Sequence, residues 1–177
     1  DMETEHEVPA NVMEGIFAKQ MDLAMKYKDI EGMGDLLDTT PDNINTAKGQ
    51  KWIKDFAWRV TEEIAEALEA KPISKEHYLE EITDALHFLT ELTIIAGYDS
   101  AIVDVMFPHE NKNEMHTVYF LGVMCNTLKN KPWKQTQIKT DESKFKSMVM
   151  LAFDSLMRAA KAAGINSQEH MYDLYFR

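Results

Sequence analysis

The chain has 177 residues, 45% of them hydrophobic, and a formal net charge of −11 at pH 7. Its length and apolar content predict one compact domain and argue against disorder, while the negative charge argues against general binding to nucleic acids or anionic membranes. Glycine and proline are few and Met, Ala, Leu, Lys and Glu are plentiful, which favours helices. No apolar run approaches the roughly 20 residues that span a bilayer and nothing resembles a signal peptide, so we expect a cytoplasmic protein.

The first third of the chain predicts one helix followed by a loop. Residues 1–11 are polar and are expected to form a flexible N-terminus. Apolar residues then recur at helical spacing from Val12 to about Lys28, which predicts a helix. Residues 31–46 contain two glycines, a proline and several Asp and Asn residues, so we expect a loop there.

A helical hairpin is predicted next. One helix is expected from Gln50 to Ala70, because apolar and aromatic side chains recur along it and Pro72 then prevents its continuation. The aromatic residues Trp52, Phe56 and Trp58 could contact a substrate, but aromatic residues at helical spacing are expected to pack in the core first. Ser74 is suited to cap a further helix that runs to Ala96 and stops at Gly97.

The second half resembles a diverged copy of that hairpin. Helices are predicted at about 116–129 and 140–163, and Ala163-Gly164 matches Ala96-Gly97 while Lys131-Pro132 matches Lys71-Pro72. The predicted fold is therefore an all-α bundle of two packed helical hairpins, residues 50–107 and 116–176, within a single domain that covers residues 12–177. In this alignment the acids of the first hairpin correspond to uncharged residues of the second, namely Val123, Asn126, Met148 and Leu151.

Two acidic motifs in the first hairpin share one pattern, Glu62-Glu63-Ile64-Ala65-Glu66 and Glu80-Glu81-Ile82-Thr83-Asp84. Within each motif two acids stand three residues apart, so on a helix they project from one face, one turn apart. Two antiparallel helices would bring the four carboxylates of Glu63, Glu66, Glu81 and Asp84 together. Such a cluster repels itself unless a cation neutralises it, and Mg²⁺, or Mn²⁺ in its place, prefers oxygen ligands.

A Mg²⁺ ion held by carboxylates indicates phosphate chemistry, because substrate phosphates are usually among its ligands. The ion would neutralise phosphate charge and lower the pKa of a bound water, which makes hydrolysis of a nucleoside triphosphate the natural reaction. An acid beside the ligands could act as general base, and Glu62 is the candidate at the first motif, with Glu80 at the second. A single Glu on a helix is more often an exposed residue, but the recurrence of the pattern favours a metal site.

The pair of motifs resembles the all-α nucleoside triphosphate pyrophosphatase superfamily, which includes MazG-type enzymes, dimeric dUTPases and phage dCTP/dUTP pyrophosphatases. Glu81-Ile82-Thr83-Asp84-Ala85-Leu86-His87-Phe88 is similar to the Glu-x-x-Asp-x-x-His-Phe segment of the dimeric dUTPase branch. The resemblance implies cleavage between the α and β phosphates, with Glu63, Glu66, Glu81 and Asp84 as Mg²⁺ ligands. It also implies that Glu62, or a ligating residue such as Glu63, orients the attacking water.

The same resemblance implies substrate contacts. Gln20 stands where the branch has a glutamine that binds the pyrimidine edge, and an amide can both donate and accept hydrogen bonds. The alternative is a polar residue on an amphipathic helix. His87 and Phe88 are candidates for substrate contact, with a core histidine and a packing aromatic residue as the equally good alternative.

The chain departs from the branch in two places. The Trp-Lys element expected after the first motif is absent there and occurs instead as Trp133-Lys134, so these residues, with Lys129, are candidates for contacts to base or phosphate from the second hairpin. A solvated basic turn is the alternative. The Lys- and Asn-rich segment that the branch has near its C-terminus has no counterpart before Arg177.

The leading hypothesis is a Mg²⁺-dependent pyrophosphohydrolase for dUTP or dCTP, closest to the phage branch, acting in the host cytoplasm if it is phage-encoded. The resemblance favours a homodimer, but a chain with two hairpins could also close its own bundle as a monomer. Two alternatives remain: a MazG-like enzyme for purine or non-standard nucleotides, and a catalytically silent helical protein that binds a nucleotide or a partner. The sequence does not separate dUTP from dCTP, because a glutamine amide can rotate to suit either base.

Overall fold

The computed structural model describes residues 12–37, 41–103, 113–128, 139–164 and 173. Every regular element in these ranges is a helix, so the prediction of an all-α fold is confirmed. In chain order the elements are α1 (Val12–Glu31), α2 (Gly34–Leu37), the 3₁₀ helix η1 (Pro41–Asn45), α3 (Ala47–Ala70), α4 (Lys75–Ile95), the 3₁₀ helix η2 (Ser100–Val103), α5 (Glu114–Thr127) and α6 (Glu142–Ala162).

The ends of α3 and α4 follow from local chemistry. The Thr46 hydroxyl accepts a hydrogen bond from the backbone N–H of Gly49 at 3.0 Å, and the Ser74 hydroxyl accepts one from His77 N–H at 3.2 Å. Each cap satisfies an N–H group that has no partner within its helix. After α4, Gly97 adopts a φ of 83°, a left-handed conformation that glycine takes without strain. The predicted N-cap and stop of α4 are therefore confirmed.

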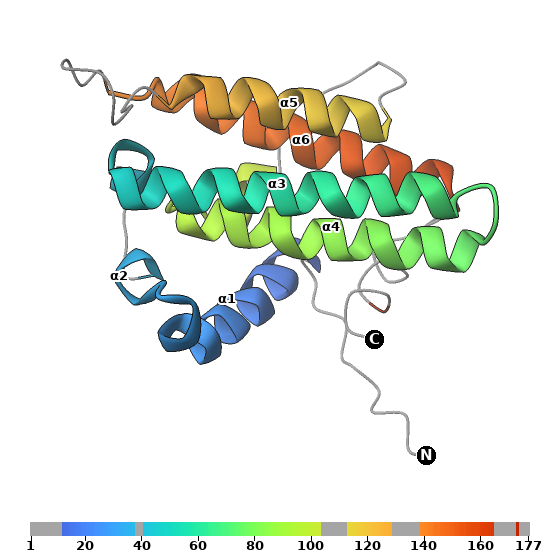
Figure 1. Cartoon of the computed structure of the whole chain (residues 1–177), viewed down its shortest axis with the longest axis horizontal. Coiled ribbons are helices and arrows are strands. Elements are labelled where there is room, and N and C mark those ends of the chain that lie inside the picture. Colours follow the sequence, from blue (N-terminus) through green and yellow to red (C-terminus); the bar gives the residue numbers. More distant parts are fainter. Residues whose placement is uncertain (1–11, 38–40, 104–112, 129–138, 165–172, 174–177) are drawn as a thin grey trace.

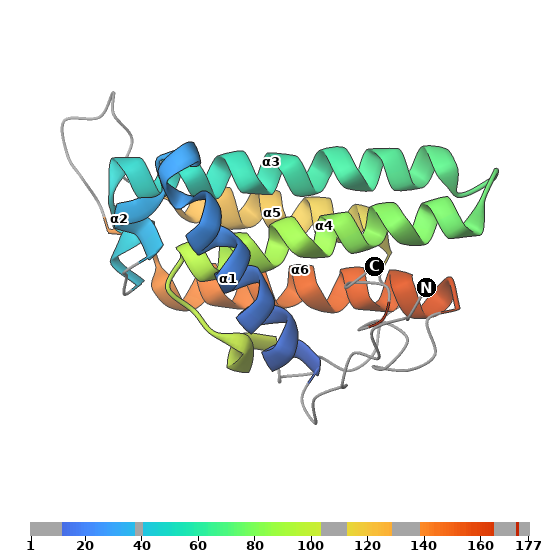
Figure 2. The same cartoon turned by 90° about the horizontal axis from the view of Figure 1, so that it is seen from below.

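The helices pack as two antiparallel pairs in two layers. α3 lies along α4, and α5 lies along α6, with α3 against α5 and α4 against α6 (Figure 1). α1 crosses α4 and also reaches α6, since the rings of Phe17 and Phe153 stack with their centroids 6.1 Å apart (Figure 2). α4 is therefore covered by α1 as well as by α6, while one edge of the α3–α4 pair faces solvent.

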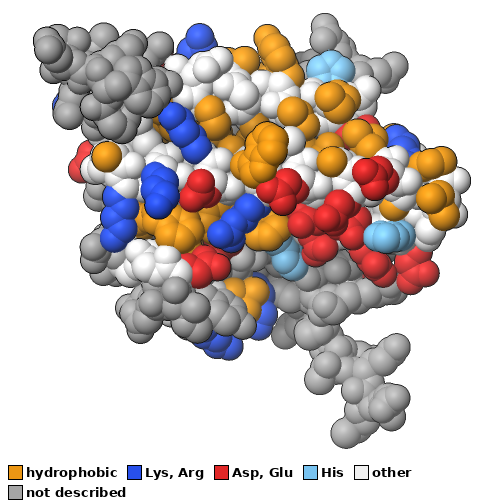
Figure 3. Space-filling view, viewed as in Figure 1, with side chains coloured by type: hydrophobic (Ala, Val, Ile, Leu, Met, Phe, Trp, Pro, Cys, Tyr) orange, Lys and Arg blue, Asp and Glu red, His pale blue; other side chains and the backbone are white. Residues whose placement is uncertain are grey.

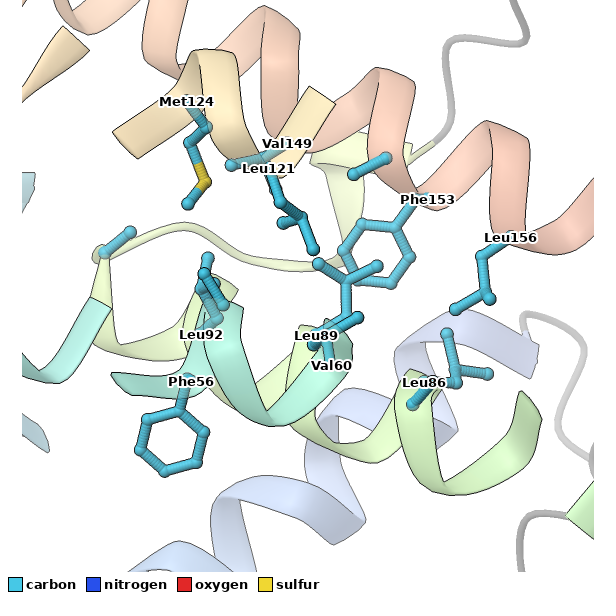
Figure 4. Packing of buried hydrophobic residues seen from close by; sticks show 14 of the residues in the cluster. Phe56, Val60, Leu86, Leu89, Leu92, Leu121, Met124, Val149, Phe153 and Leu156 are labelled. Carbon is cyan, nitrogen blue, oxygen red and sulfur yellow. The ribbon is translucent and has the colours of Figure 1, made fainter. Parts of the chain in front are cut away.

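The core lies between the two pairs. Val60 of α3 and Leu89 of α4 point toward Phe153 of α6, and Leu86 faces Leu156 (Figure 4). All five side chains are at most 3% exposed. Burying each apolar side chain of this size stabilises the fold by roughly 1.5–3 kcal/mol. These contacts therefore determine which faces of α3 and α4 point into the core and which faces point toward solvent.

A buried polar contact also joins the two pairs. The carboxylate of Glu114, at the start of α5, accepts hydrogen bonds from Lys71 Nζ at 2.8 Å and from the Tyr78 hydroxyl. Lys71 caps the end of α3 and Tyr78 lies in the first turn of α4, so Glu114 fixes α5 against the α3–α4 connection.

The predicted loop over residues 31–46 is wrong in part, because α2 and η1 lie within it. Asn43 explains this difference. Its buried amide donates to the backbone carbonyls of Leu36 at 3.1 Å and of Ile95 at 2.6 Å, which ties η1 to α2 and to the end of α4. A Cβ atom at Gly49 would collide with the Asn43 backbone, so glycine is required for this close approach. These contacts bridge distant parts of the chain and leave no periodic pattern in the sequence.

Candidate metal centre

The two acidic motifs meet on the solvent-facing edge of the α3–α4 pair. Glu63 and Glu66 lie one turn apart on α3, and Glu81 lies on the neighbouring face of α4. Carboxylate oxygens of these three residues all lie within 4.8 Å of one another. Two oxygens on opposite sides of one Mg²⁺ are about 4.2 Å apart, so the spacing is close to that which a shared cation imposes. The donor set is therefore suited to a hard divalent cation.

Asp84, the fourth predicted ligand, borders this group of three. It lies one turn after Glu81 on α4, is exposed, and its charge acts on both Glu63 and Glu66. The structure thus brings three of the four predicted ligands together and leaves Asp84 beside them. We call Glu63, Glu66, Glu81 and Asp84 the acidic cluster.

Electrostatics within the acidic cluster favour a retained proton. Burial raises the pKa of Glu63 to about 8, assisted by its hydrogen bond with Glu81 and by the charges of Glu66, Glu81 and Asp84. The hydrogen bond with Glu81 and the charge of Glu81 also raise the pKa of Glu66. Burial acts to raise the pKa of Glu81, but hydrogen bonds from Glu63, Glu66 and His77 outweigh it and lower that pKa. Glu81 is therefore the charged acceptor, and its neighbours hold the proton.

His77 adjoins the acidic cluster and was not predicted from the sequence. Its Nε2 lies 3.0 Å from Oε1 of Glu81, one turn further along α4. Together with Glu66, Glu69, Ala70 and Ile73 it lines a surface hollow of about 320 Å³. The His-Glu spacing of four residues within a predicted helix was the available signal.

The molecular surface shows the same division of charge. Acidic side chains gather over the part of the α3–α4 pair nearest its connecting turn, next to histidine, whereas Lys and Arg side chains lie mainly over the opposite half (Figure 3). The general-base candidates border the acidic patch: Glu62 and Glu80 are exposed, and their charges raise the pKa of Glu66 and of Asp84, respectively.

A second polar group lies on the same faces of α3 and α4, about two helical turns further from the α3–α4 connection than the acidic cluster. It consists of Gln20 and Glu31 of α1, Arg59 of α3 and Glu91 of α4, and we call it the Glu91 group. Gln20 is 5% exposed and hydrogen-bonds to Glu91, which is 9% exposed. Burial and the charge of Glu31 raise the pKa of Glu91 to about 7, against the opposing effects of Arg59 and Gln20.

Arg59 links the Glu91 group to two aromatic rings. Its guanidinium carbon lies 4.5 Å from the ring centroid of Phe56 and 5.7 Å from that of Phe88, and its Nη1 lies 3.8 Å from Glu31 Oε1. Phe88 is half-buried and packs against the core as well as standing beside Arg59. Neither Arg59 nor Glu91 was predicted from the sequence, because their partners come from three different helices.

The other predicted contact residues have mixed positions. His87 is half-buried on α4. Trp52 and Phe56 pack with the core, but Trp58 is 64% exposed, so its expected place in the core is wrong. Position 58 faces away from α4, because it lies two residues after Phe56 on the helix. Lys129, Trp133, Lys134 and Arg177 lie outside the described residues.

Comparisons with protein-family models, curated proteins and solved structures find no match to this chain. Among the helices of the described ranges, none combines the length and the apolar character needed to cross a bilayer. The acidic cluster and the Glu91 group are therefore the features of the described residues that indicate a function.

Proposed function

We propose that the chain is a Mg²⁺-dependent nucleoside triphosphate pyrophosphohydrolase that converts dUTP or dCTP to the monophosphate and pyrophosphate. The observation that supports this most is the convergence of Glu63, Glu66 and Glu81 from two helices within 4.8 Å. A self-repelling carboxylate group on a solvent-facing edge has no evident role in packing, and a divalent cation is its natural partner.

The residues of the cluster divide the chemistry between them. Glu63, Glu66 and Glu81 would hold Mg²⁺, with Asp84 completing the set, and the ion would neutralise phosphate charge and acidify a bound water. Glu62, one turn before Glu66 and exposed, would accept a proton from the attacking water, and Glu63 is the alternative. Mn²⁺ offers the same coordination preference and is the expected substitute.

The proposed contacts to the base lie further along the same faces of α3 and α4. Gln20 supplies an amide for the base, and Phe88 and His87 lie between it and the acidic cluster along α4. Lys129, Trp133 and Lys134 remain proposed contacts to phosphate or base. A homodimer remains part of the proposal, and light scattering after size-exclusion chromatography tests it.

The decisive test is analysis of phosphate products. The protein is incubated with Mg²⁺ and separately with dUTP, dCTP, dTTP, dATP and dGTP, and the products are resolved by ion-exchange chromatography. We expect monophosphate and pyrophosphate from dUTP or dCTP alone. Turnover mainly of purine nucleotides would favour the MazG-like alternative, and no turnover of any nucleotide would contradict an enzymatic function and favour a silent binder.

A matched pair of variants assigns any activity to the cluster. Glu66→Gln removes a ligand charge while keeping the shape of the side chain, and Glu69→Gln makes the same change at an exposed position one turn away. Loss of turnover in the first variant alone would support the site, and equal activity of both variants would reject it.

A further inference from the structure

Gln20 and Glu91 form a buried contact between α1 and α4. Their side chains are 5% and 9% exposed, and a hydrogen bond joins them. An ionised carboxylate has only acceptor atoms, whereas an amide has a donor NH₂ group and an acceptor carbonyl. The amide of Gln20 therefore has to turn its NH₂ group toward Glu91.

The charged groups around Glu91 come from two other helices. Arg59 of α3 favours the ionised carboxylate, and Glu31 at the end of α1 opposes it. Arg59 is itself held over the rings of Phe56 and Phe88. A guanidinium has only donor groups, so it supports Glu91 as an acceptor and thereby supports the same orientation of the Gln20 amide.

The position of this contact suits the base of a nucleotide whose phosphates lie at the acidic cluster. Glu91 follows Asp84 by seven residues on α4, which corresponds to about 10 Å along the helix axis. That separation is comparable to the span from the phosphates of a nucleotide to its base, and Phe88 lies between the two positions.

The orientation of an amide distinguishes the two pyrimidines. At positions 4 and 3 uracil presents an acceptor and then a donor, whereas cytosine presents a donor and then an acceptor. An amide free to rotate pairs with either base, but an amide held in one orientation pairs with one base and leaves the other with unmatched polar groups.

We propose that Glu91 is a positioning residue that holds the amide of Gln20 in one orientation and so restricts the enzyme to one of the two deoxypyrimidine triphosphates. This inference rests on the proposed function. Glu91 would then decide between dUTP and dCTP through the orientation of a single amide.

The test compares kcat/KM for dUTP and dCTP in the wild-type protein, in Glu91→Gln, in Gln20→Ala and in the double variant, at about pH 8.5, where a carboxyl with a pKa of about 7 is ionised and only accepts hydrogen bonds. We expect the wild-type protein to prefer one nucleotide by roughly 10- to 100-fold, the effect of one unmatched buried polar group. A Gln at position 91 can donate or accept, so the preference should fall to within about threefold. In the Gln20→Ala background, Glu91→Gln should change the ratio no further, because the two residues act through one contact.

Several outcomes would overturn the inference. The first is equal use of both nucleotides by the wild-type protein, and the second is an unchanged preference in Glu91→Gln. The third is an unchanged preference in Gln20→Ala, a variant that tests the contact even if Glu91→Gln does not fold. Binding of dUMP and dCMP, followed by tryptophan fluorescence, separates the two proposals. If the protein binds and hydrolyses these nucleotides but the variants do not change the preference as expected, only the role of Glu91 is rejected. If the protein neither binds nor hydrolyses them, the proposed function is rejected as well.

Discussion

The α3–α4 pair and the α5–α6 pair share one architecture but differ in what they place on their faces. Each is an antiparallel pair of helices, and the two pairs pack against each other through a common core. In the predicted alignment, the positions of α5 and α6 that correspond to the acidic cluster are occupied by Val123, Asn126, Met148 and Leu151. Three of these four side chains are half-buried and only Asn126 is exposed. Helix pairing in this molecule therefore does not require acids at these positions.

The acidic cluster differs from the buried acids elsewhere in its effect on the stability of the fold. Burial and like charges raise the pKa of Glu63 to about 8, so the fold works against the ionised cluster rather than deriving stability from it. Buried acids elsewhere have partners: Asp154 of α6 accepts from Arg158 Nε at 3.0 Å, and Glu114 accepts from Lys71 and Tyr78. Groups that a fold does not need and that oppose its stability are typical of functional sites.

The largest expected effect is on turnover. Glu81→Gln, which removes the charge at the centre of the cluster, should lower kcat/KM by more than the roughly 10- to 100-fold that loss of an outer-shell partner of a metal costs. Asn126→Ala, at a corresponding position of α5–α6, should leave turnover unchanged. Steady-state kinetics on dUTP and dCTP measure both, and far-UV circular dichroism verifies that each variant is helical. Equal activities would remove the functional distinction between the two pairs.

The next effect concerns Glu91 and pH. Its pKa is raised from 4.5 to about 7, so the folded protein binds this proton more tightly than the unfolded chain does. Its contribution to stability is therefore favourable below about pH 4.5 and is lost as the pH rises to 7, a change on the order of 3 kcal/mol. Glu91→Gln should remove this part of the pH dependence.

Urea unfolding of the metal-free protein between pH 4.5 and pH 8 measures this contribution, read as the difference between the wild type and Glu91→Gln. Asp55→Asn, an exposed change on α3, is the control and should shift stability by less than about 0.5 kcal/mol at every pH. A difference between wild type and Glu91→Gln that does not vary with pH would contradict the buried, proton-binding state of Glu91.

The polar contact between the two pairs should have a smaller effect. Glu114→Ala leaves the buried hydroxyl of Tyr78 without its acceptor and frees Lys71, which should lower the free energy of unfolding by about 1–3 kcal/mol. Lys144→Ala, an exposed change on α6, is the matched control. If the two variants are equally stable, Glu114 does not fix α5 against the α3–α4 connection.

The smallest expected effect is stabilisation by the cation itself. Mg²⁺ at ten times its dissociation constant should add about 1.4 kcal/mol to the free energy of unfolding. Because Glu63 has to lose its proton to become a ligand and its pKa is about 8, this gain should increase as the pH rises from 6 to 8. Thermal unfolding with and without Mg²⁺ measures it, and a gain that is the same in Glu66→Gln would place the ion elsewhere.

Local chemistry made much of this structure predictable from the sequence. Apolar periodicity placed α3 within three residues of its observed start, and Ser74 and Gly97 marked the two ends of α4. The spacing of the acids within each motif gave their common face. Each of these features depends on residues within one or two turns of one another.

Features that depend on contacts between distant segments were not predicted. The amide of Asn43, in η1, donates a hydrogen bond to the carbonyl of Ile95, and the buried amide of Gln20 hydrogen-bonds to Glu91. Trp58 is exposed, although an aromatic residue at helical spacing is usually predicted to lie in the core. No local pattern distinguishes a polar residue on the surface of an amphipathic helix from one that is buried against a partner on another helix.

Titration of the protein with Mn²⁺, followed by water-proton relaxation, tests the central claim most directly. The account predicts saturable binding to the wild-type protein that is lost in Glu81→Gln and retained in Asn126→Ala. Absence of saturable binding, or binding of equal strength in Glu81→Gln, would contradict the assignment of the acidic cluster as a divalent-cation site.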